Sequence, residues 1–371
     1  MTSILFYIET LQAGGAEKVL RTLVNNMDQS KFDITVMTLW PEEAGQYLAP
    51  GIHYQSLYRA KNRWNHAFYR LEAALGLTYR SRIHGDFDIE AAYLECGPTK
   101  VMAGSTNKKA LKLAWVHCDL SKKSSNTESF VRKSKAWYQT YDNIVCVAEN
   151  VQERYVQLFG GQPPATVLHN IIDEDEILAK VSACKVPRDH RTTLAAIGRL
   201  SPEKGNDRLL TACGKLKSEG FDFCLWLVGD GPERESLEQQ IARTHLEDCV
   251  KLWGFQSNPY PYMQASDLIV CPSRFEGFST VVTEALILGK PVVTTACSGM
   301  DELLGNSEYG LITENSEDGL YEGLKKMLEQ PELLRHYEAQ AKLRGGDFRK
   351  EHLVKQTEDF FISALGVKTK T

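Results

Sequence analysis

Two carboxylates stand eight positions apart where an apolar run gives way to a helical pattern, at Glu276 and Glu284. The run 268–271 predicts a buried strand, and the stretch 281–288 predicts a helix. The candidate N-caps of this helix are Ser279 and Thr280. Carboxylates accept hydrogen bonds from hydroxyls, and the free N–H groups of a helix start attract anions. The segment is therefore a candidate site for a phosphorylated sugar. Two solvated glutamates that only complement the helix dipole would give the same pattern.

A second charged cluster lies in the turn 198–205, directly after the apolar run 194–197. Arg199 follows the end of this predicted strand, and Lys204 lies at the start of the next helix. Two cations at a helix start are unfavourable for the helix dipole unless an anion lies between them. The turn therefore favours a diphosphate site over a structural role. With the two glutamates it predicts a site for phosphate, ribose and sugar at one sheet edge.

The first half of the chain contributes two weaker signals. Gly14 and Gly15 follow the first predicted strand and open a helix, so backbone N–H groups there can approach an anion or a substrate closely. Ordinary tight turns use glycine in the same way. His117 ends the strand 111–116, where it is placed to hydrogen-bond a transferred sugar. A lone histidine at a strand end is also common as a packing residue. We assign His169, the competing histidine, to a hinge or packing role.

The sequence argues against a nicotinamide cofactor and against a metal site. The segment from Gly229 begins like a dinucleotide fingerprint, but Arg234 stands where the third glycine is needed and Pro232 lacks an N–H. The acidic stretches 86–88 and 173–175 each fit an Asp-x-Asp pattern, which is common by chance. We expect the first to be a solvated strand entry and the second to lie in a helix's first turn. No metal and no cofactor are therefore predicted.

Parallel strands must bring these residues together, and short apolar runs alternate with amphipathic helices almost throughout. The predicted strands are 4–8, 34–39, 52–57, 89–94, 111–116, 144–147, 166–168, 194–197, 224–228, 250–252, 268–271, 291–295 and 311–313. Such runs indicate an α/β fold with two Rossmann-like, doubly wound domains that face each other across a cleft. The expected domains are 1–170 and 171–347. A helix at 348–366 has no strand after it, and the tail 367–371 is expected to be disordered.

Composition excludes several classes of protein. The 371 residues carry a net charge of −5, which gives no reason to expect a nucleic-acid partner. Nine cysteines without a C-x-x-C pattern are typical of a reducing cytosol. We expect no signal peptide and no membrane span, since no apolar run approaches ~20 residues. Residues 51–140 nevertheless hold 15 Lys/Arg against 7 Asp/Glu. This basic stretch could face anionic lipid or an acidic acceptor, or it could be a solvated helix surface.

Taken in order, the motifs resemble those of glycosyltransferase family 4, retaining transferases of group 1 type with the GT-B fold. The matching segments are 14–18, 198–205, 228–232, 276–284 and, more weakly, 310–312. The likeness extends through the second domain, from about 194 to 327, whereas the first domain matches only at its ends and around His117. In this fold a final helix crosses back to the first domain, which would explain the helix at 348–366.

The resemblance implies a role for each matching residue. Gly15, beside Gly14, would lie next to the diphosphate of a nucleotide-sugar donor, and Arg199 and Lys204 would neutralise it. Glu276 would hold the donor sugar's hydroxyls and Glu284 those of the ribose, while His117 would lie near the sugar. Backbone N–H groups near the sugar would be those of Gly277, Phe278 and Ser279, with Thr280 completing the donor-binding segment. The resemblance implies retention at the anomeric carbon without a metal.

The implied activity is transfer of a sugar from a nucleotide-diphosphate sugar, with a UDP-sugar as the expected donor. The implied acceptor is a saccharide or a lipid-linked saccharide in cell-surface polysaccharide synthesis. The protein is then expected in the cytoplasm, at the inner face of the cell membrane if the basic first domain associates peripherally with lipid. Two alternatives stay open at this point. One is a GT-B nucleotide-sugar epimerase, and the other is a non-catalytic transferase-like partner subunit.

Overall fold

The computed structural model describes residues 1–12, 14–43, 47–123, 126–188, 190–276 and 278–369. The chain divides into two compact units. The first comprises Met1–Ile171 together with Lys350–Thr371, and the second comprises Ile172–Arg349. The boundary expected between 170 and 171 lies one residue before this division, and the C-terminal segment that belongs to the first unit begins two residues after the expected 348.

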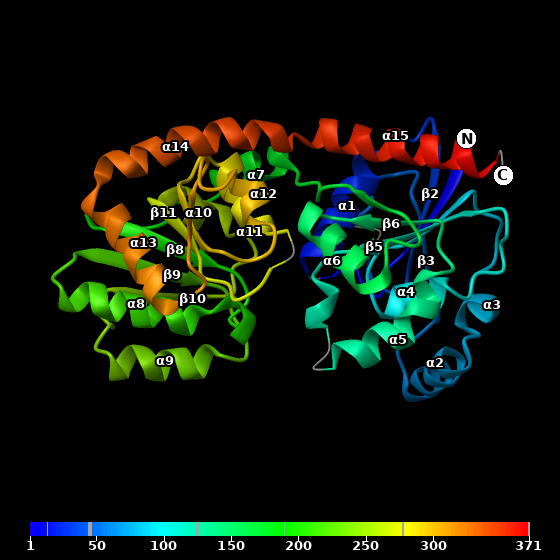
Figure 1. The fold of residues 1–371 in the computed structure, drawn as a ribbon, viewed down its shortest axis with the longest axis horizontal. Coiled ribbons are helices and arrows are strands. Elements are labelled where there is room, and N and C mark those ends of the chain that lie inside the picture. The colour runs from blue at the N-terminus through cyan, green and yellow to red at the C-terminus, as the bar shows by residue number, and fades with distance from the viewer. Residues whose placement is uncertain (13, 44–46, 124–125, 189, 277, 370–371) are drawn as a thin grey trace. The chain divides into compact units, whose positions relative to one another are not determined.

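The first unit is built on a parallel sheet of seven strands in the order β3-β2-β1-β4-β5-β6-β7 (Figure 1). The strands are β1 (Thr2–Tyr7), β2 (Phe32–Thr38), β3 (His53–Ser56), β4 (Ile89–Ala92), β5 (Leu111–Val116), β6 (Asn143–Cys146) and β7 (Ala165–Val167). All seven expected strands are present, with ends shifted by at most two residues. The order reverses direction between β1 and β4, so this sheet has its topological switch point there.

Helices connect these strands by parallel crossovers. They are α1 (Gly15–Asn26), α2 (Arg63–Leu75), α3 (Thr78–Arg82), α4 (Gly97–Met102), α5 (Thr127–Tyr138) and α6 (Glu149–Phe159), with a short 3₁₀ helix η2 (Leu120–Lys122). A further helix, α15 (Lys350–Lys368), comes after the second unit in the chain and connects no strands. Right-handed crossovers on opposite sides of the switch point place α1 on one face and α4, α5 and α6 on the other. Helix α15 contacts α1 and β5, and so completes the first of these layers.

The C-terminal helix fills part of the first unit's core. Phe361 is fully buried, with ring centroids 6.1 Å from Phe6, 6.3 Å from Phe32 and 6.1 Å from Trp115. The helix begins and ends two residues later than expected. The predicted disorder of the tail is wrong for Val367 and Lys368, which are helical. The Lys368 ammonium lies 2.6 Å from a carboxylate oxygen of Asp142 and so ties the helix end to the unit.

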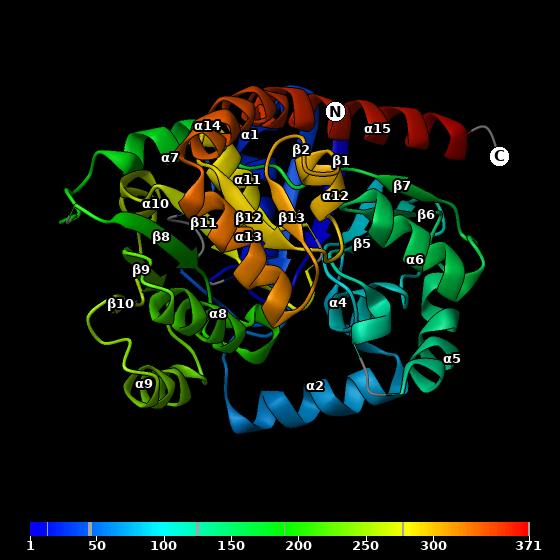
Figure 2. The same ribbon diagram turned by 60° about the vertical axis from the view of Figure 1, so that its left-hand side comes forward.

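The second unit contains a parallel sheet of six strands in the order β10-β9-β8-β11-β12-β13 (Figure 2). The strands are β8 (Thr192–Ile197), β9 (Phe223–Val228), β10 (Val250–Gly254), β11 (Leu268–Cys271), β12 (Val292–Thr295) and β13 (Leu311–Thr313). All six were expected, again to within two residues. Its switch point lies between β8 and β11. The expected fold of two doubly wound, Rossmann-like parallel sheets is confirmed.

Helices cover both faces of this sheet. They are α7 (Glu174–Val181), α8 (Asn206–Ser218), α9 (Arg234–Arg243), α10 (Tyr260–Ala265), α11 (Thr280–Ile287), α12 (Met300–Leu304), α13 (Glu317–Glu329) and α14 (Pro331–Gly345), with 3₁₀ helices η3 (Pro202–Lys204) and η4 (Gly346–Phe348). Helices α8, α9 and α13 form one layer, while α7, α10, α11 and α14 pack together on the other side (Figure 1). All six residues of β9 are buried, as expected for a central parallel strand.

In the part of the chain that the structure describes, no helix is both long enough and apolar enough to cross a membrane.

Candidate active site

A small pocket, with a cavity volume of about 10 Å³, lies at the switch point of the second unit. Its walls come from the loops that follow β8 and β11, and they include Arg199, Lys204, Ser273 and Glu276. These two strands are neighbours in the sheet and run in the same direction, so the residues that follow them meet at one edge. This is the place where open α/β sheets bind ligands.

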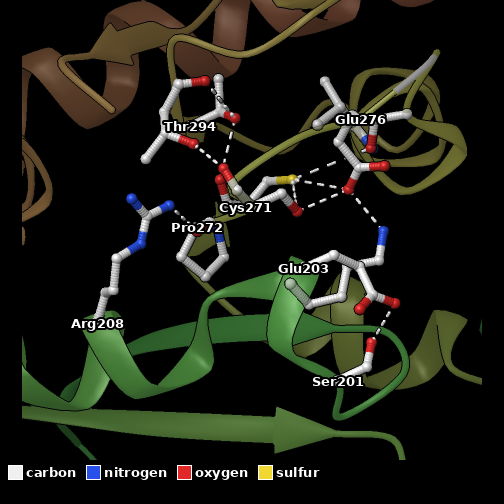
Figure 3. Close-up of polar contacts among 12 residues, drawn as sticks. Ser201, Glu203, Arg208, Cys271, Pro272, Glu276 and Thr294 are labelled. Atoms are coloured by element: carbon white, nitrogen blue, oxygen red, sulfur yellow. Dashed lines mark hydrogen bonds and ion pairs between the residues drawn. The ribbon is translucent and has the colours of Figure 1, made fainter. Parts of the chain in front are cut away.

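The centre of the pocket is an ion pair between Lys204 and Glu276. The ammonium nitrogen lies 2.5 Å from Oε1 of the carboxylate, and the hydroxyl of Ser273 donates to the same oxygen at 2.6 Å (Figure 3). Both side chains are mostly buried, with 29% of Lys204 and 12% of Glu276 exposed. Burial acts to lower the pKa of Lys204, but the adjacent Glu276 outweighs it and raises that pKa above its ordinary value. Lys204 is therefore a cation held against a carboxylate.

This pairing corrects one step of the sequence interpretation. A cation at this turn was expected to need a bound anion, but Glu276 of the protein already supplies a negative charge to Lys204. Lys204 also lies in η3, just before α8 begins at Asn206. Arg199 is exposed and lines the same pocket. The pocket therefore contains one paired cation, one exposed cation and a carboxylate. If Lys204 and Glu276 separate, the cations can bind phosphate and the carboxylate can bind hydroxyl groups.

Close backbone contacts fix the loop that carries Arg199. Gly229 adopts φ 147°, and a Cβ atom there would lie 1.8 Å from the carbonyl oxygen of Gly198. A Cβ atom at Gly231 would lie 2.3 Å from the carbonyl oxygen of Leu200. The Leu200 N–H donates to the carbonyl of Asp230 at 3.0 Å. The glycines that failed as a dinucleotide fingerprint thus let the turn after β9 pack against the candidate site's own loop.

The buried Arg208 joins the two walls of the pocket. Its guanidinium donates to the carbonyl of Pro272 at 2.7 Å (Figure 3). It also donates to the side-chain oxygen of Asn315 at 2.8 Å. Gly205 has φ 65°, and a Cβ atom there would lie 2.3 Å from the Pro272 carbonyl oxygen. The start of α8 therefore contacts the loop after β11 directly. No sequence motif predicts a role for Arg208 or Ser273. Their only signal in the sequence is that they follow β8 and β11, whose ends form the pocket.

Glu284 has a different environment from Glu276. It lies within α11, is 7% exposed, and accepts a hydrogen bond from the hydroxyl of Tyr260 at 3.0 Å. Burial, with the charge of Glu284, raises the pKa of Tyr260 far above its ordinary value. Sequence reasoning missed Tyr260, which lies in α10 and is 24 residues away from its partner. The two glutamates of the motif are thus divided between the pocket and the interior.

The segment between the two glutamates contains the start of α11. Ser279 is the N-cap, and its hydroxyl accepts a hydrogen bond from the N–H of Val282 at 3.4 Å. Thr280 is the first helical residue. The ring of Phe278 is buried 6.1 Å from that of Phe348, a packing contact. Gly277 lies outside the described residues.

In the first unit, Gly14 and Gly15 occupy the turn after β1. Helix α1 begins at Gly15 with Gly14 as its N-cap. The carboxylate of Glu17 folds back over this turn, so that a Cβ atom at Gly14 would lie 2.0 Å from it. Burial raises the pKa of Glu17. The glycine therefore makes room for the chain's own carboxylate next to the helix start.

His117 follows β5 and is held at the same sheet edge. Its ring lies 5.1 Å from that of Tyr93, and its Nε2 atom is buried with no hydrogen-bond partner among the described residues. Burial lowers the pKa of His117 to about 4, against the opposing effect of Glu95. The imidazole is therefore neutral near pH 7. Its hydrogen bond to the Tyr93 backbone uses the one ring N–H, which leaves the lone pair on the unpartnered Nε2 atom.

A buried carboxylate that sequence reasoning missed holds His117. Glu95 follows β4 and is 4% exposed. One of its oxygens accepts the backbone N–H of His117 at 3.1 Å, and the other lies 2.6 Å from the ammonium of Lys123. Burial acts to raise the pKa of Glu95, but Lys123 and His117 outweigh it and lower that pKa. An acid at a strand end was the only signal in the sequence.

The remaining candidates have structural contacts. Asp88 accepts hydrogen bonds from the N–H and the hydroxyl of Ser3, at 2.8 and 3.0 Å. Asp173 caps α7 through the N–H of Glu176. A ring nitrogen of His169 lies 3.3 Å from the carbonyl oxygen of Val147. Across the described ranges, no group of three or more His, Cys, Asp or Glu side chains is arranged to hold a metal ion.

Sequence comparison connects the second unit with known transferases. Residues 183–344 match the family described as "Glycosyl transferases group 1". The N-acetylgalactosamine-N,N'-diacetylbacillosaminyl-diphospho-undecaprenol 4-alpha-N-acetylgalactosaminyltransferase of Campylobacter jejuni is 28% identical over 98% of this chain and 100% of its own length. The lipopolysaccharide core biosynthesis glycosyltransferase LpsD of Rhizobium meliloti is 31% identical over 53% of this chain and 56% of its own length.

Solved structures extend the likeness to both units. The Anabaena protein HepE in complex with UDP and glucose has a TM-score of 0.80 at 21% identity, covering 98% of this chain and 100% of that one. The sucrose-phosphate synthase of Thermosynechococcus elongatus has a TM-score of 0.78 at 16% identity, covering 99% and 100%. At these identities the likeness establishes the fold. The chain therefore has the GT-B fold, and the comparisons support a glycosyltransferase whose second unit matches the group 1 glycosyl transferases.

Proposed function

We propose that this protein is a retaining glycosyltransferase of family 4 that moves a sugar from a UDP-sugar to a saccharide or lipid-linked acceptor. The observation that carries the proposal is the pocket at the β8/β11 switch point. There Arg199 and Lys204, from the loop after β8, meet Glu276, from the loop after β11. The two partners of the ion pair, Lys204 and Glu276, are 72 residues apart in the sequence. Cations suit a diphosphate and a carboxylate suits sugar hydroxyls, so the residues that line the pocket offer partners to both parts of such a donor.

In the proposed reaction, the bond between the anomeric carbon and the diphosphate oxygen breaks while the acceptor oxygen bonds to the same carbon on the same face. The acceptor's proton passes to the departing phosphate oxygen. Arg199 and Lys204 stabilise the negative charge that builds on the leaving group. Glu276, released from Lys204 as the donor enters, orients the sugar through its hydroxyls. Glu284 serves the ribose, and the lone pair of His117 Nε2 accepts from a sugar hydroxyl.

Two cationic side chains at the diphosphate allow the reaction to proceed without a metal ion, and we propose that it does. The retaining outcome follows from the family resemblance, and front-side displacement is preferred because the sequence offers no dedicated nucleophile. The assignment of donor binding to residues 171–347 and of acceptor binding to residues 1–170 belongs to the same proposal.

The names of the relatives support the acceptor class. One acts on a diphospho-undecaprenol-linked saccharide, and another belongs to lipopolysaccharide core biosynthesis. We therefore place this protein in cell-surface polysaccharide synthesis, in the cytoplasm at the inner face of the cell membrane. Peripheral attachment through the basic part of the first unit would bring it to a lipid-linked acceptor.

A screen of nucleotide sugars for slow donor hydrolysis tests the function without knowledge of the acceptor. We expect one UDP-sugar to be consumed, with release of UDP and of a free sugar whose anomeric configuration is that of the donor. Release of an epimerised sugar would instead identify an epimerase. The absence of nucleotide release from every nucleotide sugar, together with no binding of UDP, would favour a non-catalytic partner subunit.

A further inference from the structure

Helix α2 presents an apolar stripe that nothing in the described chain covers. Asn62 caps the helix by accepting from the N–H of Asn65, and Gly76 ends it in the left-handed conformation. No residue of α2 is buried. The exposed fractions are 75% for Trp64, 52% for Phe68, 57% for Leu71 and 62% for Leu75. Such large apolar side chains, exposed together, mark an interaction surface.

Helical geometry gathers these four side chains into one line. At 3.6 residues per turn, positions 64, 68, 71 and 75 fall within about 60° of the helix circumference. Leu77, which is 43% exposed, follows directly after the helix. We call these five residues the α2 stripe. Helix α2 lies at the periphery of the first unit in both Figure 1 and Figure 2.

A different face of α2 holds the helix to the unit. The ring of Tyr69 lies 6.5 Å from that of Trp40 and 6.2 Å from that of Tyr58. Glu72 accepts from the hydroxyl of Tyr58 at 2.5 Å and pairs with the guanidinium of Arg82 at 2.7 Å. The helix thus has a distinct inner face made of aromatic and polar contacts. The α2 stripe is therefore the solvent-exposed face of a helix whose packing contacts are made elsewhere.

The segment that carries the stripe is basic. Residues 59–82 contain six Arg or Lys and a single acidic residue, Glu72. Arg82 is engaged by Glu72, whereas Arg59, Lys61, Arg63, Arg70 and Arg80 are all exposed. An apolar helix face with basic residues around it is the combination that binds the interface of an anionic bilayer.

We propose that α2 is a membrane-docking helix that inserts the stripe into the interfacial region of an anionic lipid bilayer. A second copy of the chain is a poorer occupant, because a two-fold contact would bring together two copies of the segment 59–82, each with six Arg or Lys against one acidic residue. A flat bilayer also suits a single line of apolar side chains with Trp64 at one end. The inference rests on the proposed function in one respect, that a lipid-linked acceptor would be reached from this surface.

The test is co-sedimentation of the full chain with vesicles of phosphatidylcholine, with and without phosphatidylglycerol. We expect binding to the anionic vesicles that weakens as salt is raised. The double substitution Trp64→Ser/Phe68→Ser should weaken that binding at least about tenfold. The matched control is Phe255→Ser/Leu343→Ser, since these side chains in the second unit are 75% and 67% exposed. The control should bind vesicles like the parent.

A second variant separates charge from apolar contact. Arg59→Glu/Lys61→Glu should also weaken binding and should flatten its salt dependence. Donor hydrolysis in the absence of vesicles should be unchanged in every α2 variant. If the parent hydrolyses a donor but ignores anionic vesicles, the docking proposal fails and the proposed function stands. If the parent binds anionic vesicles but neither binds nor hydrolyses any donor, the proposed function fails and the docking proposal stands. The parent could instead be a dimer in solution that the substitution Trp64→Ser/Phe68→Ser converts to a monomer. That result would show that a second copy covers the stripe, and it would overturn the proposal.

Discussion

Replacing Lys204 by Ala should cost catalysis far more than stability. The substitution removes the cation that is proposed to face the leaving diphosphate, where loss of one donor typically lowers the rate about 10²–10³-fold. The carboxylate left behind, Glu276, keeps its hydrogen bond from Ser273. The ion pair is intermediate between an exposed pair, worth about 0–1 kcal/mol, and a fully buried one, whose disruption costs about 3–5 kcal/mol. We therefore expect the free energy of unfolding to fall by about 1–2 kcal/mol.

Binding of UDP alone gives a sharper readout, because removing either partner of the ion pair should change UDP affinity in opposite directions. Lys204→Ala should bind UDP about ten- to a hundredfold more weakly, since a hydrogen bond to a charged group is worth about 1.5–3 kcal/mol. Glu276→Gln should bind UDP at least as tightly as the parent, because Lys204 no longer has a competing carboxylate. Calorimetric titration of both variants measures this contrast.

The matched control is Lys325→Ala. Lys325 lies in α13 with 30% of its side chain exposed, close to the 29% of Lys204, and pairs with Glu219 at 2.8 Å. Its removal should leave turnover and UDP affinity unchanged. Near-parental UDP affinity and turnover in Lys204→Ala would refute the site assignment. Weaker UDP binding in Glu276→Gln would refute the exchange of partners.

Three further predictions concern other parts of the proposed site. Glu276→Gln should depress turnover even at saturating donor, whereas Glu284→Gln should act mainly through weaker donor binding; steady-state kinetics that show the reverse pattern would mean that the two roles are exchanged. Activity should survive a chelator, and a strict requirement for Mg²⁺ or Mn²⁺ would overturn the proposed metal-free mechanism. Since the pKa of His117 is lowered to about 4 from an ordinary 6.5, the unfolded chain binds the proton first on acidification. Folding stability should therefore fall between pH 6.5 and pH 4, by up to about 3 kcal/mol, and urea unfolding of His117→Gln should lose this part of the pH dependence.

The strands and the place of the site could be predicted because both depend on local patterns. Buried parallel strands are apolar throughout, so runs such as 268–271 are visible in the sequence. Residues that follow neighbouring parallel strands lie at the same edge of the sheet, and this rule alone predicts that Glu276 and Lys204 lie close together. The N-cap at Ser279 follows from the chemistry of helix starts.

The contacts between loops could not be predicted, because no periodicity encodes them. The bonds of Glu276 to Lys204, of Glu284 to Tyr260 and of Glu95 to Lys123 each depend on how two loops or helices pack in three dimensions. The same limit explains the exposed face of α2. Its apolar spacing is that of any helix packed on a sheet, and only the structure shows that the other face makes the contacts.

The C-terminal helix has a consequence for the order in which the protein acquires its structure during translation. The first unit needs Phe361 beside Phe6 and Trp115, yet the ribosome makes this residue only after the whole of the second unit. A nascent chain therefore carries an incomplete aromatic core for most of its synthesis, while residues 172–349 can already fold. Deletion of a buried aromatic side chain typically costs about 3–5 kcal/mol, a large share of a domain's stability. The first unit is thus the last to become stable, and it depends on Phe361 having left the ribosome.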